Sequence, residues 1–133
     1  MKASLKHRVR QRARGLCEYC RMPSQFYLAP YQMDHILAEQ HGGATTLSNL
    51  ALACFHCNLH KGPNIAGQDP VTRRLTRLFH PRRDRWNDHF GMTKELIVGK
   101  TAIGRTTVVV LDMNHEAYVL VRQALLDAGV SFT

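Results

Sequence analysis

The sequence predicts an α+β fold: two short strands and a helix inside a metal-binding clamp, a helix before this core and a strand-helix extension after it. Two Cys-x-x-Cys pairs, Cys17/Cys20 and Cys54/Cys57, define the clamp. Between the pairs, the pattern changes from short β-like runs to a helix-like segment. The chain has 133 residues, of which 44% are hydrophobic, enough to form a core without disulfides. We therefore expect a single domain over residues 1–133.

The first part of the chain predicts a helix, a loop and a strand. Residues 3–14 are mostly polar and helix-like, and Gly15 follows them. Glycine tolerates the left-handed conformation that often ends a helix, so we expect the helix to end there. Residues 21–30 contain two prolines and predict a loop, after which residues 32–37 predict a short strand.

The next part predicts a turn back and a second helix. The two glycines at 42–43 predict a turn, and residues 45–53 return the chain as a second short strand. A helix is expected to begin at Cys54 or Phe55 and to run to Lys61, where a Gly-Pro step ends it. Two strands and a helix are thus expected inside the clamp.

The extension, residues 63–133, has weaker signals. Thr106–Leu111 is a β-branched run that predicts a buried strand. Residues 114–128 have apolar side chains at helical spacing and predict an amphipathic helix, closed by Gly129. The side chains expected on its core-facing side are Ala117, Leu120, Val121, Ala124, Leu125 and Ala128. In the stretch 73–90, arginines are expected to face outwards, and the aromatic residues expected in the core are Phe79, Trp86 and Phe90.

The four cysteines predict a structural Zn²⁺ site. Two Cys-x-x-Cys pairs supply the four thiolates that complete a tetrahedral zinc shell. No apolar run approaches the ~20 residues of a membrane span. The N-terminus lacks the apolar stretch of a secretory signal. We therefore expect no membrane association and a cytoplasmic location, where thiols stay reduced and free to bind metal.

The charge predicts a polyanionic partner. The chain carries 18 Lys and Arg against 10 Asp and Glu, which gives a net charge of +8 and a pI near 9.8. Such an excess is typical of proteins that contact nucleic-acid phosphates, although charge alone does not identify them. The basic residues gather in two stretches, 6–14 and 73–85. The side chains expected to contact the nucleic-acid backbone are Lys61, Arg8, Arg12, Arg73, Arg74, Arg82 and Arg83.

Six sequence elements follow one another in and around the clamp. They are Cys17-x-x-Cys20, Asp34-His35-Ile36, Gly42-Gly43, Asn49-Leu50, Cys54-x-x-Cys57-Asn58 and Lys61-Gly62. In this order the elements resemble the HNH endonucleases over residues 17–62. The resemblance implies a ββα core that binds one catalytic metal ion. Two positions differ from the common pattern: Ala38 replaces a frequent proline, and Asn58 replaces the third motif histidine. The extension resembles stand-alone bacterial members only loosely.

Hydrolysis of a phosphodiester needs a base that activates water, a cation that neutralises the phosphate, and groups that align them. His35 is the candidate base, because imidazole exchanges a proton readily near neutral pH. Asn49 is expected to orient the His35 ring through a hydrogen bond. Asp34 and Asn58 offer oxygen ligands that suit Mg²⁺ or Mn²⁺, with Ni²⁺ or another transition metal as an alternative. Neighbouring residues of a strand point to opposite faces, so Asp34 and His35 require a bulge or a strong twist.

The sequence thus predicts a metal-dependent DNA endonuclease of the HNH type that uses one catalytic metal and contacts mainly the DNA backbone. Two alternatives stay open: a zinc-dependent DNA-binding module without catalysis, and a ribonuclease that uses the same site. A histidine at position 35 would by itself indicate a core residue, and the neighbouring carboxylate and amide groups favour the catalytic interpretation. His56 and His60, one turn apart on the expected helix, also fit a metal pair, but we expect them to contact solvent or phosphate.

Overall fold

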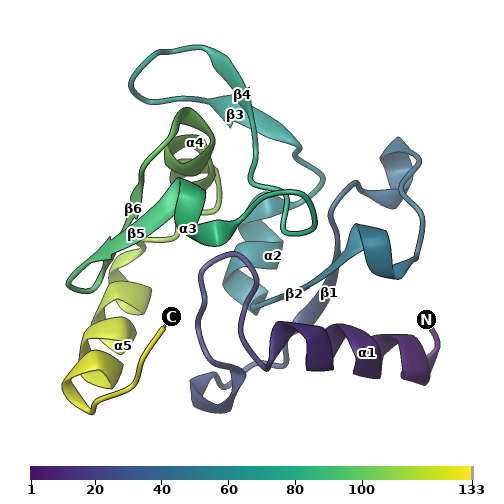
Figure 1. Ribbon diagram of the computed structural model, residues 1–133, viewed down its shortest axis with the longest axis horizontal. Coiled ribbons are helices and arrows are strands. Elements are labelled where there is room, and N and C mark those ends of the chain that lie inside the picture. Colours follow the sequence, from purple (N-terminus) through teal and green to yellow (C-terminus); the bar gives the residue numbers. More distant parts are fainter. Residues whose placement is uncertain (133) are drawn as a thin grey trace.

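The structure, a computed structural model, describes residues 1–132. Helices and strands are mixed along the chain (Figure 1), which confirms the α+β class. The elements are α1 (Ala3–Ala13), β1 (Gln32–His35), β2 (Leu50–Ala53), α2 (Phe55–Lys61), β3 (Ala66–Gln68), β4 (Leu75–Arg77), α3 (Trp86–His89), β5 (Phe90–Thr93), β6 (Leu96–Gly99), α4 (Ala102–Val110) and α5 (Glu116–Asp127). Within residues 1–132, no helix is long and apolar enough to cross a membrane.

Two antiparallel strands followed directly by a helix lie between the two cysteine pairs. β1 pairs with β2 residue by residue, and β2 is buried along its whole length. The Cys54 side chain caps α2 by accepting a hydrogen bond from the amide of Cys57. The helix ends at Gly62, which adopts a positive φ of 51°. The predicted bounds of this helix are confirmed.

α1 lies against β2 on one side of the core (Figure 1). Val9 is fully buried there among side chains of β2. The Arg12 guanidinium donates to the carbonyl oxygens of Leu47 at 2.8 Å and Leu50 at 2.6 Å. The helix is confirmed, and its left-handed cap is Arg14, with a φ of 56°, one residue before the glycine expected to end it.

The segment predicted as a buried strand, Thr106–Leu111, is mostly helical: residues 106–110 belong to α4, and Leu111 is its C-cap. The Thr101 side chain begins this helix by accepting a hydrogen bond from the Gly104 amide. The Thr107 hydroxyl donates to the Ile103 carbonyl at 2.7 Å, a bond that accommodates a β-branched residue within a helix. α4 packs against β3, β4 and β6. The cap and this packing outweigh the strand propensity of the run.

α5 confirms the predicted C-terminal helix, but the face that it buries is not the face predicted to be buried. Gly129, with a φ of 85°, closes it as expected. Leu120 and Val121, expected in the core, are 59% and 38% exposed. The residue of α5 that is buried is Arg122, whose guanidinium donates to two main-chain carbonyls and to the Asn114 side chain. Because a buried cation is costly without hydrogen bonds, these three bonds from its terminal nitrogens favour the helix rotation that places Arg122 inside.

Two hairpins of the extension, β3–β4 and β5–β6, were not predicted. Their strands have three and four residues, too few for a reliable alternating pattern. The main core surrounds the four cysteines and includes Phe79, Trp86 and Phe90, which confirms the predicted placement of these three aromatic residues. Gly104 touches the chain before β5, where an added Cβ would lie 1.9 Å from the His89 carbonyl oxygen. This close contact seats α4 beside the core.

Candidate active site and metal centres

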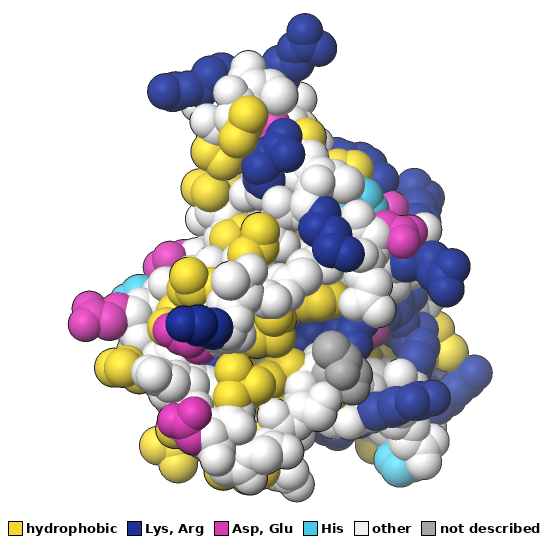
Figure 2. Space-filling model, turned by 60° about the vertical axis from the view of Figure 1, so that its left-hand side comes forward, with side chains coloured by type: hydrophobic (Ala, Val, Ile, Leu, Met, Phe, Trp, Pro, Cys, Tyr) yellow, Lys and Arg dark blue, Asp and Glu magenta, His cyan; other side chains and the backbone are white. Residues whose placement is uncertain are grey.

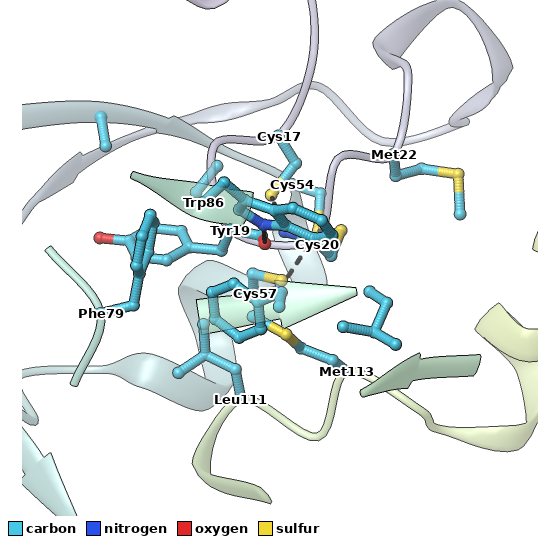
Figure 3. Packing of buried hydrophobic residues seen from close by; sticks show 14 of the residues in the cluster. Cys17, Tyr19, Cys20, Met22, Cys54, Cys57, Phe79, Trp86, Leu111 and Met113 are labelled. Atoms are coloured by element: carbon cyan, nitrogen blue, oxygen red, sulfur yellow. Dashed lines mark hydrogen bonds between the residues drawn. The ribbon is translucent and has the colours of Figure 1, made fainter. Parts of the chain in front are cut away.

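The four cysteines converge on one point in the core (Figure 3). Their ligand atoms lie within 4.8 Å of one another, and all four residues are buried. Cys17 and Cys20 come from the turn after α1, whereas Cys54 and Cys57 come from the start of α2. The sulfurs of Cys20 and Cys54 are 3.8 Å apart. The spacing thus brings both pairs to one centre, as predicted.

The surroundings of the sulfurs suit thiolate ligands. The Cys20 amide donates to the Cys17 sulfur at 3.4 Å, and the Cys57 amide donates to the Cys54 sulfur at 3.3 Å. Such bonds stabilise negative charge on sulfur. All four cysteines are free of disulfides, and four sulfur donors match a tetrahedral zinc shell. Zinc bound here would hold the turn after α1 to the start of α2.

Residues of the extension form part of the wall around this centre. Tyr19 lies between the first two cysteines. Its main-chain carbonyl accepts a hydrogen bond from Trp86 Nε1 at 2.7 Å. Phe79 packs edge-on against the Tyr19 ring, with centroids 6.5 Å apart. The Arg21 guanidinium lies 4.7 Å from the Trp86 ring centroid. The extension therefore shields the four cysteines, a role that their spacing alone does not reveal.

Asp34, His35 and Asn58 line one cavity of about 360 Å³ at the junction of β1 and α2. The β1–β2 ladder gives Asp34 and His35 one partner each, so the bulge expected at this point is absent from residues 32–35. The Asp34 side chain is 4% exposed and that of His35 is 18% exposed. Both side chains thus line the cavity from a strand without a bulge, and Asp34 is the less exposed of the two.

The His35 ring is oriented by two side chains that the sequence did not single out. Its Nε2 lies 2.9 Å from the Thr45 hydroxyl oxygen and 3.4 Å from a carboxylate oxygen of Glu39. Because a carboxylate only accepts hydrogen bonds, this geometry favours a proton on Nε2 and a free lone pair on Nδ1. Both partners belong to the loop between β1 and β2, and no local motif marks them.

Asn49 does not hydrogen-bond to the His35 ring, which corrects its expected role. Its side-chain oxygen accepts from the Leu37 amide, and its side-chain nitrogen donates to the carbonyls of Leu37 and Ala44, each at 2.9 Å. Asn49 thus ties together the ends of the loop that carries both partners of His35. Gly43 permits this closure, because an added Cβ would lie 1.7 Å from the Leu37 carbonyl oxygen.

Asp34 belongs to a buried polar network. The Tyr19 hydroxyl donates to its Oδ2 at 2.5 Å, and the Lys61 ammonium lies 3.3 Å from its Oδ1. Burial raises the pKa of the Asp34 carboxyl, and Lys61 and Tyr19 offset only part of that rise. Lys61 also donates to the carbonyls of His35 and Ile36. Since Lys61 is 2% exposed, the expected contact with nucleic-acid phosphate is wrong for this residue.

Five of the arginines predicted to contact nucleic acid lie on the surface. Lys and Arg side chains gather at the tip of the projecting β3–β4 hairpin and along one side of the molecule (Figure 2). The exposed members of the predicted set are Arg8, Arg12, Arg73, Arg74 and Arg83. They are placed where they can meet a phosphate backbone.

Arg12 and Arg82 also have partners within the fold. Arg12 holds α1 to main-chain carbonyls at the start of β2. Arg82 is half-buried and ion-paired with Glu18, and burial lowers the pKa of its guanidinium to about 10. These bonds give both guanidinium groups a role within the fold, and contact of either one with nucleic-acid phosphate stays a prediction.

A larger cavity of about 740 Å³ lies between the β1–β2 loop and the segment that follows β4. Its walls carry nitrogen-rich side chains, among them Asn49, Arg77, His80, Arg82 and Arg83. Arg77 is held by two hydrogen bonds to the Asp84 carboxylate, at 2.7 and 2.9 Å. The cavity therefore combines a positively charged wall with the loop that orients the candidate base.

Comparison with known families connects this geometry to one enzyme class. Residues 17–64 match the family model described as HNH endonuclease. That range begins at the first cysteine and includes β1, β2 and α2, together with every side chain proposed above for catalysis or metal binding. No curated protein and no solved structure gives a significant match to the chain.

Proposed function

Because the chain carries an HNH endonuclease domain at residues 17–64, we propose that it hydrolyses phosphodiester bonds of DNA with one catalytic divalent metal ion. The observation that carries the proposal is the single cavity lined by Asp34, His35 and Asn58, next to the four-cysteine centre. The cavity combines a base, a carboxylate and an amide oxygen. This combination is what metal-assisted phosphodiester hydrolysis requires.

His35 is the proposed general base. With Nε2–H directed at Thr45 and Glu39, the lone pair of Nδ1 can accept a proton from a water molecule in the cavity. The resulting hydroxide attacks phosphorus, the bond from phosphorus to the leaving oxygen breaks, and the leaving oxygen takes a proton from water. The Glu39 carboxylate then stabilises the imidazolium that forms. Asn49 is a positioning residue, because it acts on His35 through the loop and not by direct contact.

Asp34 and Asn58 are the proposed ligands of the catalytic metal. Each Asp34 oxygen already accepts one hydrogen bond, from Tyr19 or Lys61, and a carboxylate oxygen retains a second lone pair for a cation. Oxygen ligands of this kind fit Mg²⁺ or Mn²⁺, with Ni²⁺ or another transition metal as an alternative. Such an ion, when bound, would neutralise charge on the phosphate and the leaving oxygen.

The surface supports a nucleic-acid substrate. The arginines at the β3–β4 tip and the positively charged wall of the larger cavity lie outside residues 17–64, so the extension would supply much of the contact with the backbone. Contacts to phosphate carry little sequence information. We therefore propose DNA binding that depends mainly on the backbone.

A plasmid assay tests the function. Purified full-length protein, with zinc retained, is incubated with supercoiled plasmid and Mg²⁺, Mn²⁺ or Ni²⁺, and His35→Ala serves as the matched variant. Relaxed or linear plasmid formed by the wild type alone, and only with a divalent metal, supports the proposal. Plasmid that is bound but left intact with every metal would identify a DNA-binding module without catalysis. Cleavage of labelled RNA but not of DNA would identify a ribonuclease.

A further inference from the structure

A second group of metal-ligating side chains lies on α2, outside the proposed active site. His56, His60 and Asp112 each offer one ligand atom, and these atoms lie within 4.8 Å of one another. The two histidines are one turn apart on the helix, and Asp112 lies in the connection between α4 and α5. Asn58 is two positions from each histidine, hence about 200° around the helix axis. None of the three residues lines the cavity of Asp34, His35 and Asn58.

Hydrogen bonds hold both imidazoles in tautomers that can bind a metal. His56 Nε2 lies 2.7 Å from the main-chain oxygen of Asp112, and His60 Nδ1 lies 2.9 Å from the main-chain oxygen of His56. A carbonyl oxygen only accepts, so both of these nitrogens carry protons. His56 therefore keeps a lone pair on Nδ1, and His60 keeps one on Nε2. Metal-ligating histidines are commonly oriented by a bond of this kind from the other ring nitrogen.

The distance between the free ligand atoms of His60 and Asp112 suits a bridging metal ion. His60 Nε2 lies 4.0 Å from Asp112 Oδ2, too far for a direct hydrogen bond. An ion about 2.0–2.2 Å from each atom can bridge that separation with small side-chain adjustments. The His60 and Asp112 side chains are 36% and 45% exposed, so a metal and its water ligands can enter from solvent.

Aromatic side chains of the C-terminal part of the chain pack against the His56 ring. It is buried, and its centroid lies 4.1 Å from that of Tyr118 and 5.7 Å from that of His115. His115 caps α5, where its Nδ1 accepts from the Ala117 amide. His115 is therefore assigned to the cap and not to the ligand set. The expectation that His56 contacts solvent or phosphate is wrong, because this packing encloses it.

We propose that His56, His60 and Asp112 form a second divalent-metal site, distinct from both the four-cysteine centre and the active site. Two imidazole nitrogens and one carboxylate oxygen, completed by water, form a donor set typical of Zn²⁺ or Ni²⁺. A metal bound there joins α2 to the α4–α5 connection. Since α2 also carries Cys57 and Asn58, the site would fasten the C-terminal extension to the helix that the HNH domain uses for both of its own metals.

Titration of the zinc-loaded full-length protein with Ni²⁺ tests the site. Wild type and His7→Ala, which removes an exposed histidine of α1, are expected to bind one more equivalent of Ni²⁺ than His60→Ala. Asp112→Asn removes the carboxylate but suits the positive φ of 48° at this position, so it should weaken the same equivalent without disturbing the backbone. Binding should also raise the melting temperature of wild type more than that of either site variant.

Two comparisons separate this site from the active site. In an Asn58→Ala background, which removes a proposed catalytic ligand, the equivalent that depends on His60 should persist. The four-cysteine zinc should remain bound in every variant, as checked by elemental analysis. Equal Ni²⁺ stoichiometry and equal thermal shifts in wild type and His60→Ala would overturn the proposal, whether or not the protein cleaves DNA.

Discussion

The Lys61 ammonium lies 3.3 Å from the Asp34 carboxylate, and the two side chains are only 2% and 4% exposed. Asp34 belongs to β1, and Lys61 is the last residue of α2, so this ion pair fastens the helix to the strand. Asn58 precedes Lys61 by three residues on the same helix. The pair therefore helps to set the distance between Asp34 and Asn58, the two proposed ligands of the catalytic metal.

Lys61→Met should lower the free energy of unfolding by about 3–5 kcal/mol at pH 7, because it leaves a buried carboxylate without its cation. Urea unfolding of the zinc-loaded protein measures this loss. The double variant Lys61→Met/Asp34→Asn should recover part of it, since no uncompensated charge then remains. Equal stability of the single and double variants would argue against a coupled pair.

Asn49→Ala should loosen the loop between β1 and β2. The substitution removes three hydrogen bonds, each worth about 0.5–1.5 kcal/mol, and should cost about 1.5–4.5 kcal/mol of stability in total. Hydrogen exchange should become faster at the Leu37 amide, whereas zinc content stays unchanged. DNA cleavage should fall because His35 loses its oriented partners.

The matched control for Asn49 is Ser48→Ala. Ser48 is exposed, and its hydroxyl hydrogen-bonds to the nearby Thr46 hydroxyl. This variant should keep normal loop protection and cleavage. If Asn49→Ala loses cleavage while the Leu37 amide stays as protected as in wild type, Asn49 takes part in catalysis more directly than we propose.

Features encoded by short-range patterns were predictable from the sequence. Cysteine spacing and a Gly-Pro stop were sufficient to place α2 between Cys54 and Gly62, and both signals act within a few residues. The convergence of both cysteine pairs also followed from spacing, because one zinc ion needs four ligands. The hydrogen-bond partners of Lys61 and Asn49 were not predictable from the sequence, because they depend on loop closure and burial in three dimensions.

Tertiary packing explains why two predictions for the extension were wrong. The β-branched run 106–111 favours a strand by local propensity, yet the Thr101 cap and contacts with three strands make it helical. α5 was correctly predicted as a helix, but burial of Arg122 turns Leu120 and Val121 outwards. Helical periodicity predicts that apolar residues face the core. It does not predict a buried arginine whose guanidinium bonds to main-chain carbonyls.

His35→Ala should reduce the cleavage rate by the ~10²-fold to 10⁴-fold typical of losing a general base. Zinc content, folding and DNA binding should persist, because His35 is proposed to hold no metal. Single-turnover cleavage of a labelled duplex measures the rate, and elemental analysis measures the zinc. Normal cleavage by His35→Ala would refute its assignment as the base.

Asn58→Ala should instead weaken the catalytic metal, so that higher Mg²⁺ or Mn²⁺ partly restores cleavage. Asn58→His should keep activity and shift the preference towards transition metals, which bind imidazole nitrogen well. Cleavage measured against metal concentration distinguishes the two variants from His35→Ala. A response of Asn58→Ala identical to that of wild type at limiting metal would exclude Asn58 as a ligand.

Asp69 should make stability depend on pH in the acidic range. Two hydrogen bonds from Arg105, at 3.0 and 2.8 Å, hold the pKa of the Asp69 carboxyl well below its usual range. A carboxyl with a lowered pKa in the folded state stabilises the fold above its unfolded pKa, near ~3.9, and loses this contribution as the pH falls. The stability difference between wild type and Asp69→Asn should therefore shrink between pH 7 and pH 3. A difference that grows on acidification would contradict this sign.

Arg73 and Arg74, which are exposed, should contribute to DNA affinity, whereas Arg82, which is paired with Glu18, should contribute little. Arg73→Gln/Arg74→Gln removes two exposed guanidinium groups from the β3–β4 tip. Each lost phosphate contact should reduce the slope of log affinity against log salt by about 0.9. Arg82→Gln breaks the pair with Glu18, so it should lower the melting temperature and leave the salt slope nearly unchanged. Fluorescence anisotropy of a labelled duplex, with every protein in the His35→Ala background to prevent cleavage, measures the slopes. A normal slope for the hairpin variant and a reduced slope for Arg82→Gln would show that Arg82, and not the β3–β4 tip, contacts the DNA backbone.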